Sequence, residues 1–282
     1  MDDIKIIAVY CIIEEAMQGL GHRSHPLAGV SDAEVLLVAV VSSIYFHNHH
    51  ERALFVMKGM RYITKPLSTS RFSRRVHALA AGGWLEYILE MLGQLYSRGE
   101  AYVIDSVPVP VCQRVRALRC RKIPGTHPHA RHFFGGCAAK RWRFYGWRLH
   151  LVCTPEGVPV RFQMLPGAWH DLTPIYELTF GLPKGASVYA DKGYVSALVK
   201  RSLRPTARST DGVQLVAKAK RSMRRDNTFL EWCGLRRYRH TIESANSQLV
   251  NMGIQRLHAR TNQGLAIKVL SSLLALAAIN IF

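Results

Sequence analysis

Two stretches of strict alternation constrain the fold of this chain most. In residues 145–152, Trp147, Leu149 and Leu151 alternate with Arg148 and His150. Residues 158–164 repeat the pattern after a Pro-Glu-Gly turn signal at 155–157. A two-residue period places the apolar side chains on one face of a β-strand. These stretches therefore predict a β-hairpin with one buried face.

Three further short apolar runs predict strands. Residues 101–104 lead into Asp105 and end at two prolines, residues 187–190 lead into Asp191, and residues 213–217 form the last run. A long basic loop is expected at about 112–142. Helical segments follow the third and fourth strands, and long helices close the chain. The predicted class is α/β, with a five-stranded mixed sheet flanked by helices.

Residues 1–98 are predicted to form a helical domain, followed by a second domain over residues 99–282. Ser31 and Glu34 form a capping-box signal before the apolar run 35–46. Helices are also expected at 51–60 and 84–96. A short helix after Ser68 carries a basic cluster, Arg71, Arg74 and Arg75. This outline is typical of a helix-turn-helix DNA reader, and a plain helical bundle fits it equally well.

The positive charge lies in one part of the chain. Lys and Arg total 38 against 19 acidic residues, a net charge of +19. Residues 1–100 hold 10 basic and 10 acidic side chains, so residues 101–282 carry the whole excess. Solubility alone does not require so one-sided a charge. Because Arg and Lys neutralise phosphates, we expect this part to bind nucleic acid.

No membrane partner is expected. The apolar runs 35–46 and 269–282 are 12 and 14 residues long, too short to span a bilayer. The N-terminus is acidic, unlike a signal peptide, so a cytoplasmic protein is predicted. The six cysteines include no CxxC pair, and reduced thiols are expected. Zinc is a minor alternative at one cluster whose spacing matches no familiar site: Cys120, His127, His129, His132 and Cys137.

Three carboxylates lie at positions that favour a catalytic role, two at strand ends and one on a helix edge. Asp105 and Asp191 each end an apolar strand, where a carboxylate is costly unless something pairs with it. Glu243 lies beside the apolar stripe of a late amphipathic helix. Carboxylate oxygens are the ligands that Mg²⁺ and Mn²⁺ prefer. Two such ions about 3.5–4 Å apart can clamp the attacking and leaving oxygens of a phosphoryl transfer.

Each of these acids also has an ordinary structural interpretation. Asp105 can bond the turn at Ser106, Asp191 can begin an Asp-Lys-Gly turn, and Glu243 can pair with Arg239. Taken singly, these interpretations are the more common ones. Together, on a strand–strand–helix framework, the three acids favour a catalytic site. Asp171 is a rival for the second acid, and Asp191 is preferred because it directly follows a strand.

Five motifs occur in order along residues 98–282: Val103-Ile104-Asp105-Ser106, Phe144-Tyr145-Gly146-Trp147-Arg148-Leu149-His150, Gly167-Ala168-Trp169-His170-Asp171, Ala190-Asp191-Lys192-Gly193-Tyr194, and Arg239-His240-Thr241-Ile242-Glu243. With them the chain resembles the DDE insertion-sequence transposases of bacteria. The catalytic domain of that family has the ribonuclease-H-like fold of retroviral integrases. Some relatives carry Tyr and Lys where this chain has Arg236 and Val250, so the subfamily stays open.

The resemblance implies that Asp105, Asp191 and Glu243 bind two catalytic ions, Mg²⁺ or Mn²⁺. It also implies that Lys192 and Arg239 contact DNA near the site. Arg236 and the basic cluster Arg71, Arg74 and Arg75 are added as expected DNA contacts.

The expected function is metal-dependent cleavage at the ends of an insertion sequence, followed by transfer of the 3′-hydroxyl ends into target DNA. The partners are then the terminal inverted repeats, the target DNA and a second copy of the chain, in a dimer or higher oligomer. The alternatives are a metal-dependent nuclease without strand transfer and an inactive DNA-binding relative.

Overall fold

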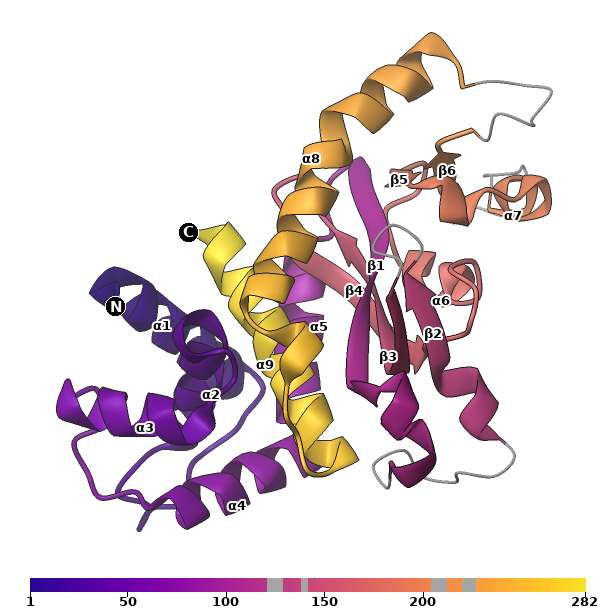
Figure 1. The fold of residues 1–282 in the computed structure, drawn as a ribbon. Helices are drawn as coiled ribbons and strands as arrows, with labels where there is room; N and C mark the ends of the chain where they lie inside the picture. The colour runs from indigo at the N-terminus through magenta and orange to yellow at the C-terminus, as the bar shows by residue number, and fades with distance from the viewer. Residues whose placement is uncertain (121–128, 138–141, 204–211, 220–226) are drawn as a thin grey trace. The chain divides into compact units, whose positions relative to one another are not determined.

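The computed structural model describes residues 1–120, 129–137, 142–203, 212–219 and 227–282 (Figure 1). Its contacts divide the chain into two compact units. The helical unit comprises Met1–Leu92 and Gln248–Phe282, and the sheet unit comprises Gly93–Ser247. The first boundary lies close to the predicted one at residue 98. Residues 248–282 were predicted as part of the second domain, but they group with the N-terminal helices.

The helical unit is built on two helices that are apolar on nearly every side. Its elements are α1 (Asp3–Gly19), α2 (Asp32–Phe46), α3 (His50–Gly59), α4 (Thr69–Ala81), the start of α5 (Trp84–Tyr96), η4 (Ile254–Arg256) and α9 (Asn262–Ile281). The predicted capping box begins α2: Ser31 caps the backbone N–H of Glu34, and the Glu34 carboxylate accepts from the Ser31 N–H. Helix α9 packs against α1, α2 and α4. A helix apolar all round belongs in a core.

Helix α9 is longer than the apolar run that predicted it. At 20 residues it is long and apolar enough to cross a membrane by length and composition alone. In the structure, 67% of its most apolar window is buried. Because the N-terminal helices cover this surface, the apolar sequence of α9 is explained by the core of the helical unit.

The sheet unit contains one mixed sheet, so the predicted succession of a helical region and a mixed sheet is confirmed (Figure 1). Strand β1 lies antiparallel to β3 and parallel to β5, and β5 lies parallel to β6. Strands β2 and β4 both pair with β3. The described strands are β1 (Ala101–Gln113), β2 (Phe134–Cys137), β3 (Trp142–Cys153), β4 (Pro159–Pro166), β5 (Ser187–Ala190) and β6 (Gln214–Ala217).

Strand β1 extends nine residues beyond the run that predicted it, through both prolines. Proline lacks an N–H and is tolerated where one edge of a strand has no partner. Strand β5 pairs with β1 only at Ala101–Ile104, whereas β3 pairs along nearly the whole strand. Pro108 and Pro110 therefore lie where β1 has one neighbour, and the register shifts between Pro110 and Cys112.

Strand β2 makes the sheet six-stranded instead of five-stranded, and it was predicted as part of a loop. Its sequence, Phe-Gly-Gly-Cys, lacks the alternation that marks a strand. A Cβ at Gly135 would lie 2.3 Å from the Phe144 ring, so glycine is required by close packing. The same predicted loop contains two short 3-10 helices, η1 (Arg114–Arg119) and η2 (His129–Phe133). His127 of the proposed zinc cluster lies outside the described residues.

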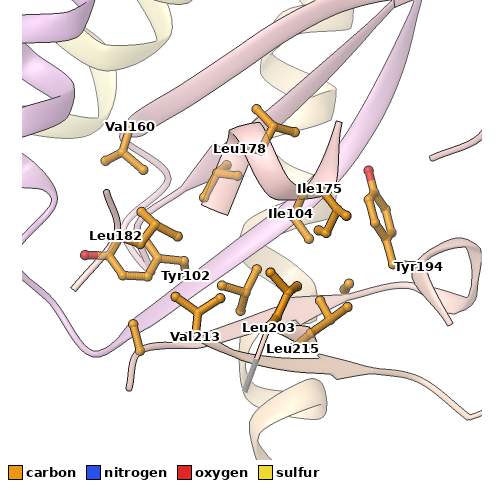
Figure 2. Packing of buried hydrophobic residues seen from close by; sticks show 14 residues of the cluster. Tyr102, Ile104, Val160, Ile175, Leu178, Leu182, Tyr194, Leu203, Val213 and Leu215 are labelled. Carbon is orange, nitrogen blue, oxygen red and sulfur yellow. The ribbon is translucent and has the colours of Figure 1, made fainter. Parts of the chain in front are cut away.

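Aliphatic and tyrosine side chains cover one face of the sheet (Figure 2). They come from β1, β3, β4, β5 and β6, from α6 (Ile175–Thr179) and α7 (Ala197–Ser202), and from η3 (Lys192–Tyr194). In Figure 2, Tyr194 stands at one end of this cluster and directs its hydroxyl away from the aliphatic side chains. The last long helix of the unit is α8 (Phe229–Asn251), whose final residues belong to the helical unit.

Candidate active site

A single cavity in the sheet unit brings the three predicted acids together. Asp105 at β1, Asp191 after β5 and Glu243 on α8 all line it. Three predicted DNA-contacting side chains, Lys192, Arg236 and Arg239, line it as well. The other lining residues are Tyr189, Ala190, Lys218, Asn227, Trp232, Leu235, Tyr238 and Ile242. Asp171, the rival second acid, does not line this cavity.

Asp105 is the most perturbed acid of the site. Burial raises the pKa of its carboxyl to about 6, and the nearby charges of Asp171 and Asp191 act in the same direction. The backbone N–H of Ser106 and the side chain of Asn246 oppose this shift. Asn246 on α8 donates to Asp105 Oδ2 over 2.6 Å. A carboxylate that is desolvated and faces like charges is suited to accept a cation.

Helix α8 reaches the site because a glycine lets it approach the sheet. A Cβ on Gly234 would lie 2.3 Å from the ring of Tyr189 on β5. One turn further along α8, Tyr238 packs on Tyr189 with ring centroids 4.8 Å apart. At the start of the helix, Glu231 pairs with Lys200 at 2.8 Å and accepts from the Thr228 N–H at 3.0 Å. These contacts set the position of α8 beside β5.

Glu243 forms an ion pair with Arg239 but could exchange it for a bound cation. Its Oε1 accepts from Arg239 Nε at 2.8 Å, one helical turn away, so the ion pair weighed from the sequence is present. Both side chains are more than half exposed, and an exposed i,i+4 ion pair contributes little because solvent screens it. Exchanging Arg239 for a cation therefore costs Glu243 little.

The cavity lining includes an aromatic side chain, Trp232, beside the predicted DNA contacts Arg236 and Arg239, and Trp232 was not predicted as part of the site. The Arg236 guanidinium lies 5.3 Å from the centroid of the Trp232 ring, and Trp232 is half exposed. Trp232, Arg236, Arg239 and Glu243 follow one another along α8 at spacings of four, three and four residues. This helical spacing places them on one face, and it was a signal that the sequence contained.

The chain was compared with families and with known proteins. A family model described as a transposase DDE domain matches residues 97–263, more than half of the chain. The chain belongs to this DDE transposase family. A solved structure described as a piggyBac transposase synaptic complex with hairpin DNA is similar at 12% identity, with a TM-score of 0.45. The alignment covers 100% of this chain and 66% of that one. A search of curated proteins finds no match.

The acids of this cavity are suited to cations, but their side chains do not form a closed ligand set. Among the described residues, no three His, Cys, Asp or Glu side chains are close enough to form a ready-made metal cage. The donor set itself fits hard cations, because carboxylate oxygens are their preferred ligands. Burial, with the charges of Asp171 and Asp191 adding to it, raises the pKa of Asp105, and a bound cation would favour the charged carboxylate.

The basic cluster of the helical unit divides into two kinds of residue. Arg75 donates to the Val30 carbonyl at 2.7 Å and pairs with Asp32, so it serves the fold of the transposase. Arg71 and Arg74 are exposed on α4 and remain predicted DNA contacts. Together these three arginines line a pocket with His25 and residues 27–30.

The pKa of Asp105 predicts how the stability of the transposase depends on pH without metal. The folded-state value of about 6 exceeds the ordinary 3.8, so charging this carboxyl disfavours the fold. The cost is absent below about pH 4, grows between pH 4 and 6, and is complete above that, at up to about 3 kcal/mol. We expect Asp105→Asn to raise the melting temperature in EDTA at pH 7.5.

The same substitution should leave the melting temperature nearly unchanged at pH 3, below both the ordinary pKa of 3.8 and the folded-state pKa of about 6, because Asp105 is then mostly protonated in both states. The matched control is Glu156→Gln, which removes one charge from an exposed turn of the same unit. Thermal unfolding by circular dichroism at pH 3 and pH 7.5 checks the prediction. An equal gain at both pH values would contradict the electrostatic explanation.

Proposed function

We propose that this chain cleaves DNA at the ends of an insertion sequence and transfers the freed 3′-hydroxyls into target DNA. The observation that carries the proposal is the single cavity that Asp105, Asp191 and Glu243 share with Lys192, Arg236 and Arg239. Acids alone suit many cation sites. Acids combined with phosphate-binding side chains suit phosphoryl transfer on a nucleic acid.

The fold supports the same reaction. A central β1 with antiparallel β3 and β4 on one side and parallel β5 and β6 on the other is the strand arrangement expected of a ribonuclease-H-like domain. In this arrangement β1 and β5 are neighbours, so Asp105 and Asp191 emerge at adjacent positions. Helix α8 then brings Glu243 to the same cavity.

The reaction consists of two displacements at phosphorus. In the first, a water oxygen forms a bond to the phosphorus at the element end. The bond from phosphorus to the 3′-oxygen breaks, and that oxygen takes up a proton. In the second, this 3′-oxygen attacks a target phosphate, loses its proton and releases a target 3′-hydroxyl. Phosphodiester bonds are exchanged in the second step, so neither ATP nor an oxidant is needed.

Each residue of the cavity has a distinct role in this proposal. Asp105, Asp191 and Glu243 would hold two Mg²⁺ or Mn²⁺ ions, which activate the attacking oxygen and stabilise the leaving oxygen. Asn246 orients the Asp105 carboxylate through its 2.6 Å hydrogen bond. Lys192, Arg236 and Arg239 are placed to bind the phosphates beside the cleaved bond. Because two element ends must join one target, we propose a dimer or higher oligomer on DNA.

Trp232 in the cavity lining yields a prediction about DNA affinity. Stacking of an unpaired base on an aromatic side chain contributes about 1–3 kcal/mol. Trp232→Ala is therefore expected to weaken binding of a DNA end with a single-stranded overhang by about 5-fold to 150-fold. Phe180→Ala removes an exposed aromatic ring that does not line the cavity and should leave the affinity unchanged. Fluorescence anisotropy at fixed salt measures both, and equal losses would contradict a role for Trp232.

The proposal as a whole is tested with purified protein and a plasmid that carries the DNA flanking the gene. The expected result is end cleavage and joined products in Mg²⁺, and neither in EDTA. Cleavage without joined products would support a nuclease instead. DNA binding without metal-dependent cleavage, on verified ends, would support an inactive DNA-binding relative.

A further inference from the structure

Asp171 touches the chain next to two of the three predicted metal ligands. Its Oδ1 accepts a hydrogen bond of 2.9 Å from Ser106, the residue that follows Asp105. Its Oδ2 lies against Gly193, two residues after Asp191. One carboxylate therefore bridges the end of β1 and the turn after β5.

Arginine 148 on β3 holds Asp171 in this place. Arg148 Nη1 donates to Ser106 Oγ at 3.1 Å and lies 3.9 Å from Asp171 Oδ1. Its Nη2 donates to the Gly136 carbonyl at 2.7 Å. The Arg148 and Asp171 side chains are only 14% and 27% exposed. A partly buried charge pair with fixed partners is more rigid than an exposed one.

Gly193 shows how closely the turn approaches Asp171. A Cβ at position 193 would lie 2.6 Å from Asp171 Oδ2. Any larger residue would displace the carboxylate from Ser106 and Arg148, because the Gly193 backbone leaves no space between them. The absence of a side chain at position 193 thus permits the contact that joins the two segments.

We infer that Asp171 is a positioning residue that sets the spacing between Asp105 and Asp191. This inference rests on the proposed function, in which these two acids share a cation. The structure does not place Asp171 in the cavity that the acids line, which argues against a direct ligand. The charge of Asp171 also acts on Asp105, in agreement with their proximity.

The test compares Asp171→Ala, Asp171→Asn, Gly193→Ala and the double variant Asp171→Ala/Gly193→Ala. Hydrogen-bonding partners of metal ligands typically affect metal affinity by about 10-fold to 100-fold. We expect Asp171→Ala to raise by this factor both the Mn²⁺ dissociation constant, measured by calorimetry, and the Mg²⁺ concentration for half-maximal cleavage. DNA affinity should not change. Asp171→Asn keeps an acceptor for Ser106 and should recover part of the loss.

The double variant makes the test specific. Gly193→Ala alone should weaken metal binding by pushing the carboxylate aside. With Ala at position 171 the new Cβ meets no carboxylate, so the double variant should be no worse than Asp171→Ala. Glu156→Gln controls for the loss of one negative charge in the same unit.

Four outcomes would decide against the inference or its premise. Unchanged metal dependence in Asp171→Ala would overturn it, as would strictly additive losses in the double variant. Complete inactivity of Asp171→Asn at every metal concentration, matching Asp191→Asn, would make Asp171 a ligand instead. If the wild-type protein neither binds Mn²⁺ nor cleaves, the proposed function itself fails, and the inference fails with it.

Discussion

Replacing Asp105 with Asn is expected to abolish DNA cleavage while leaving DNA binding intact. Asn keeps the size of Asp and an acceptor for Asn246, but it loses the negative charge that a cation requires. Partners of a metal ligand account for about 10-fold to 100-fold in activity, so loss of the ligand itself should exceed about 1000-fold. Single-turnover cleavage of an end-labelled duplex in Mg²⁺ measures the rate, and anisotropy measures binding.

The same experiment on Asp191→Asn and Glu243→Gln tests whether the three acids act as one site. The cleavage rate of each variant should fall to a similar level, because losing any one ligand weakens cation binding by the whole set. Arg239→Gln is a useful comparison, since it removes the ion pair of Glu243 without removing an acid. An active Asp191→Asn beside an inactive Asp171→Asn would show that the second ligand was assigned to the wrong residue.

Asn48→Ala is expected to lower the free energy of unfolding of the helical unit by about 4 kcal/mol. Asn48 is fully buried in the loop between α2 and α3. It accepts from Ser43 at 2.9 Å and donates to the Met252 carbonyl at 2.9 Å and to Ser272 at 3.1 Å. Its backbone is left-handed, with φ of 63°. Alanine removes all three bonds, and it tolerates this conformation less well than asparagine.

Urea unfolding followed by the helical circular dichroism signal checks this prediction. Gln263→Ala is the control, because it removes one exposed hydrogen bond to the His77 carbonyl and should cost less than about 0.5 kcal/mol. A loss of less than about 1 kcal/mol in Asn48→Ala would mean that water replaces its partners. The buried position of Asn48 argues against such replacement.

Local patterns predicted several elements correctly. The alternation around Leu149 and Leu151 predicted the hairpin of β3 and β4, and the short run at 187–190 matches β5. The prediction of a single buried face was wrong for β3, because His150 and Val152 on the opposite face are buried as well. The capping box at Ser31 correctly predicted the start of α2. In each case the signal lies within a few residues, so no knowledge of distant partners is needed.

The elements that were missed depend on partners far away in the sequence. Strand β2 has no pattern of its own and exists because β3 offers it a free edge. The prolines of β1 were taken as an end because the sequence does not show that β5 pairs only with the first four residues. Likewise, nothing local to residues 262–281 indicates that α9 completes the core of helices made 200 residues earlier.

The sequence predicted the three acids of the candidate site but not the contacts that join them to the rest of the fold. The three acids were found because strand ends and a helix edge are local features, and they line one cavity. The bridge from Ser106 through Asp171 to Gly193 joins three separate segments. Asp171 was therefore predicted as a competitor of Asp191, because the sequence does not show that Asp171 contacts both Ser106 and the turn at Gly193.

The division of the helical unit between the two ends of the chain has a consequence for synthesis. During translation, α1 to α4 are synthesised first, and α9 follows the described strands of the sheet. Until then the ten buried residues of α2 lack part of their cover. The N-terminal helices therefore lack the packing partner α9 while the sheet unit is synthesised, and their uncovered apolar surface is accessible to chaperones and proteases. A message broken before codon 262 would thus disable the part translated first.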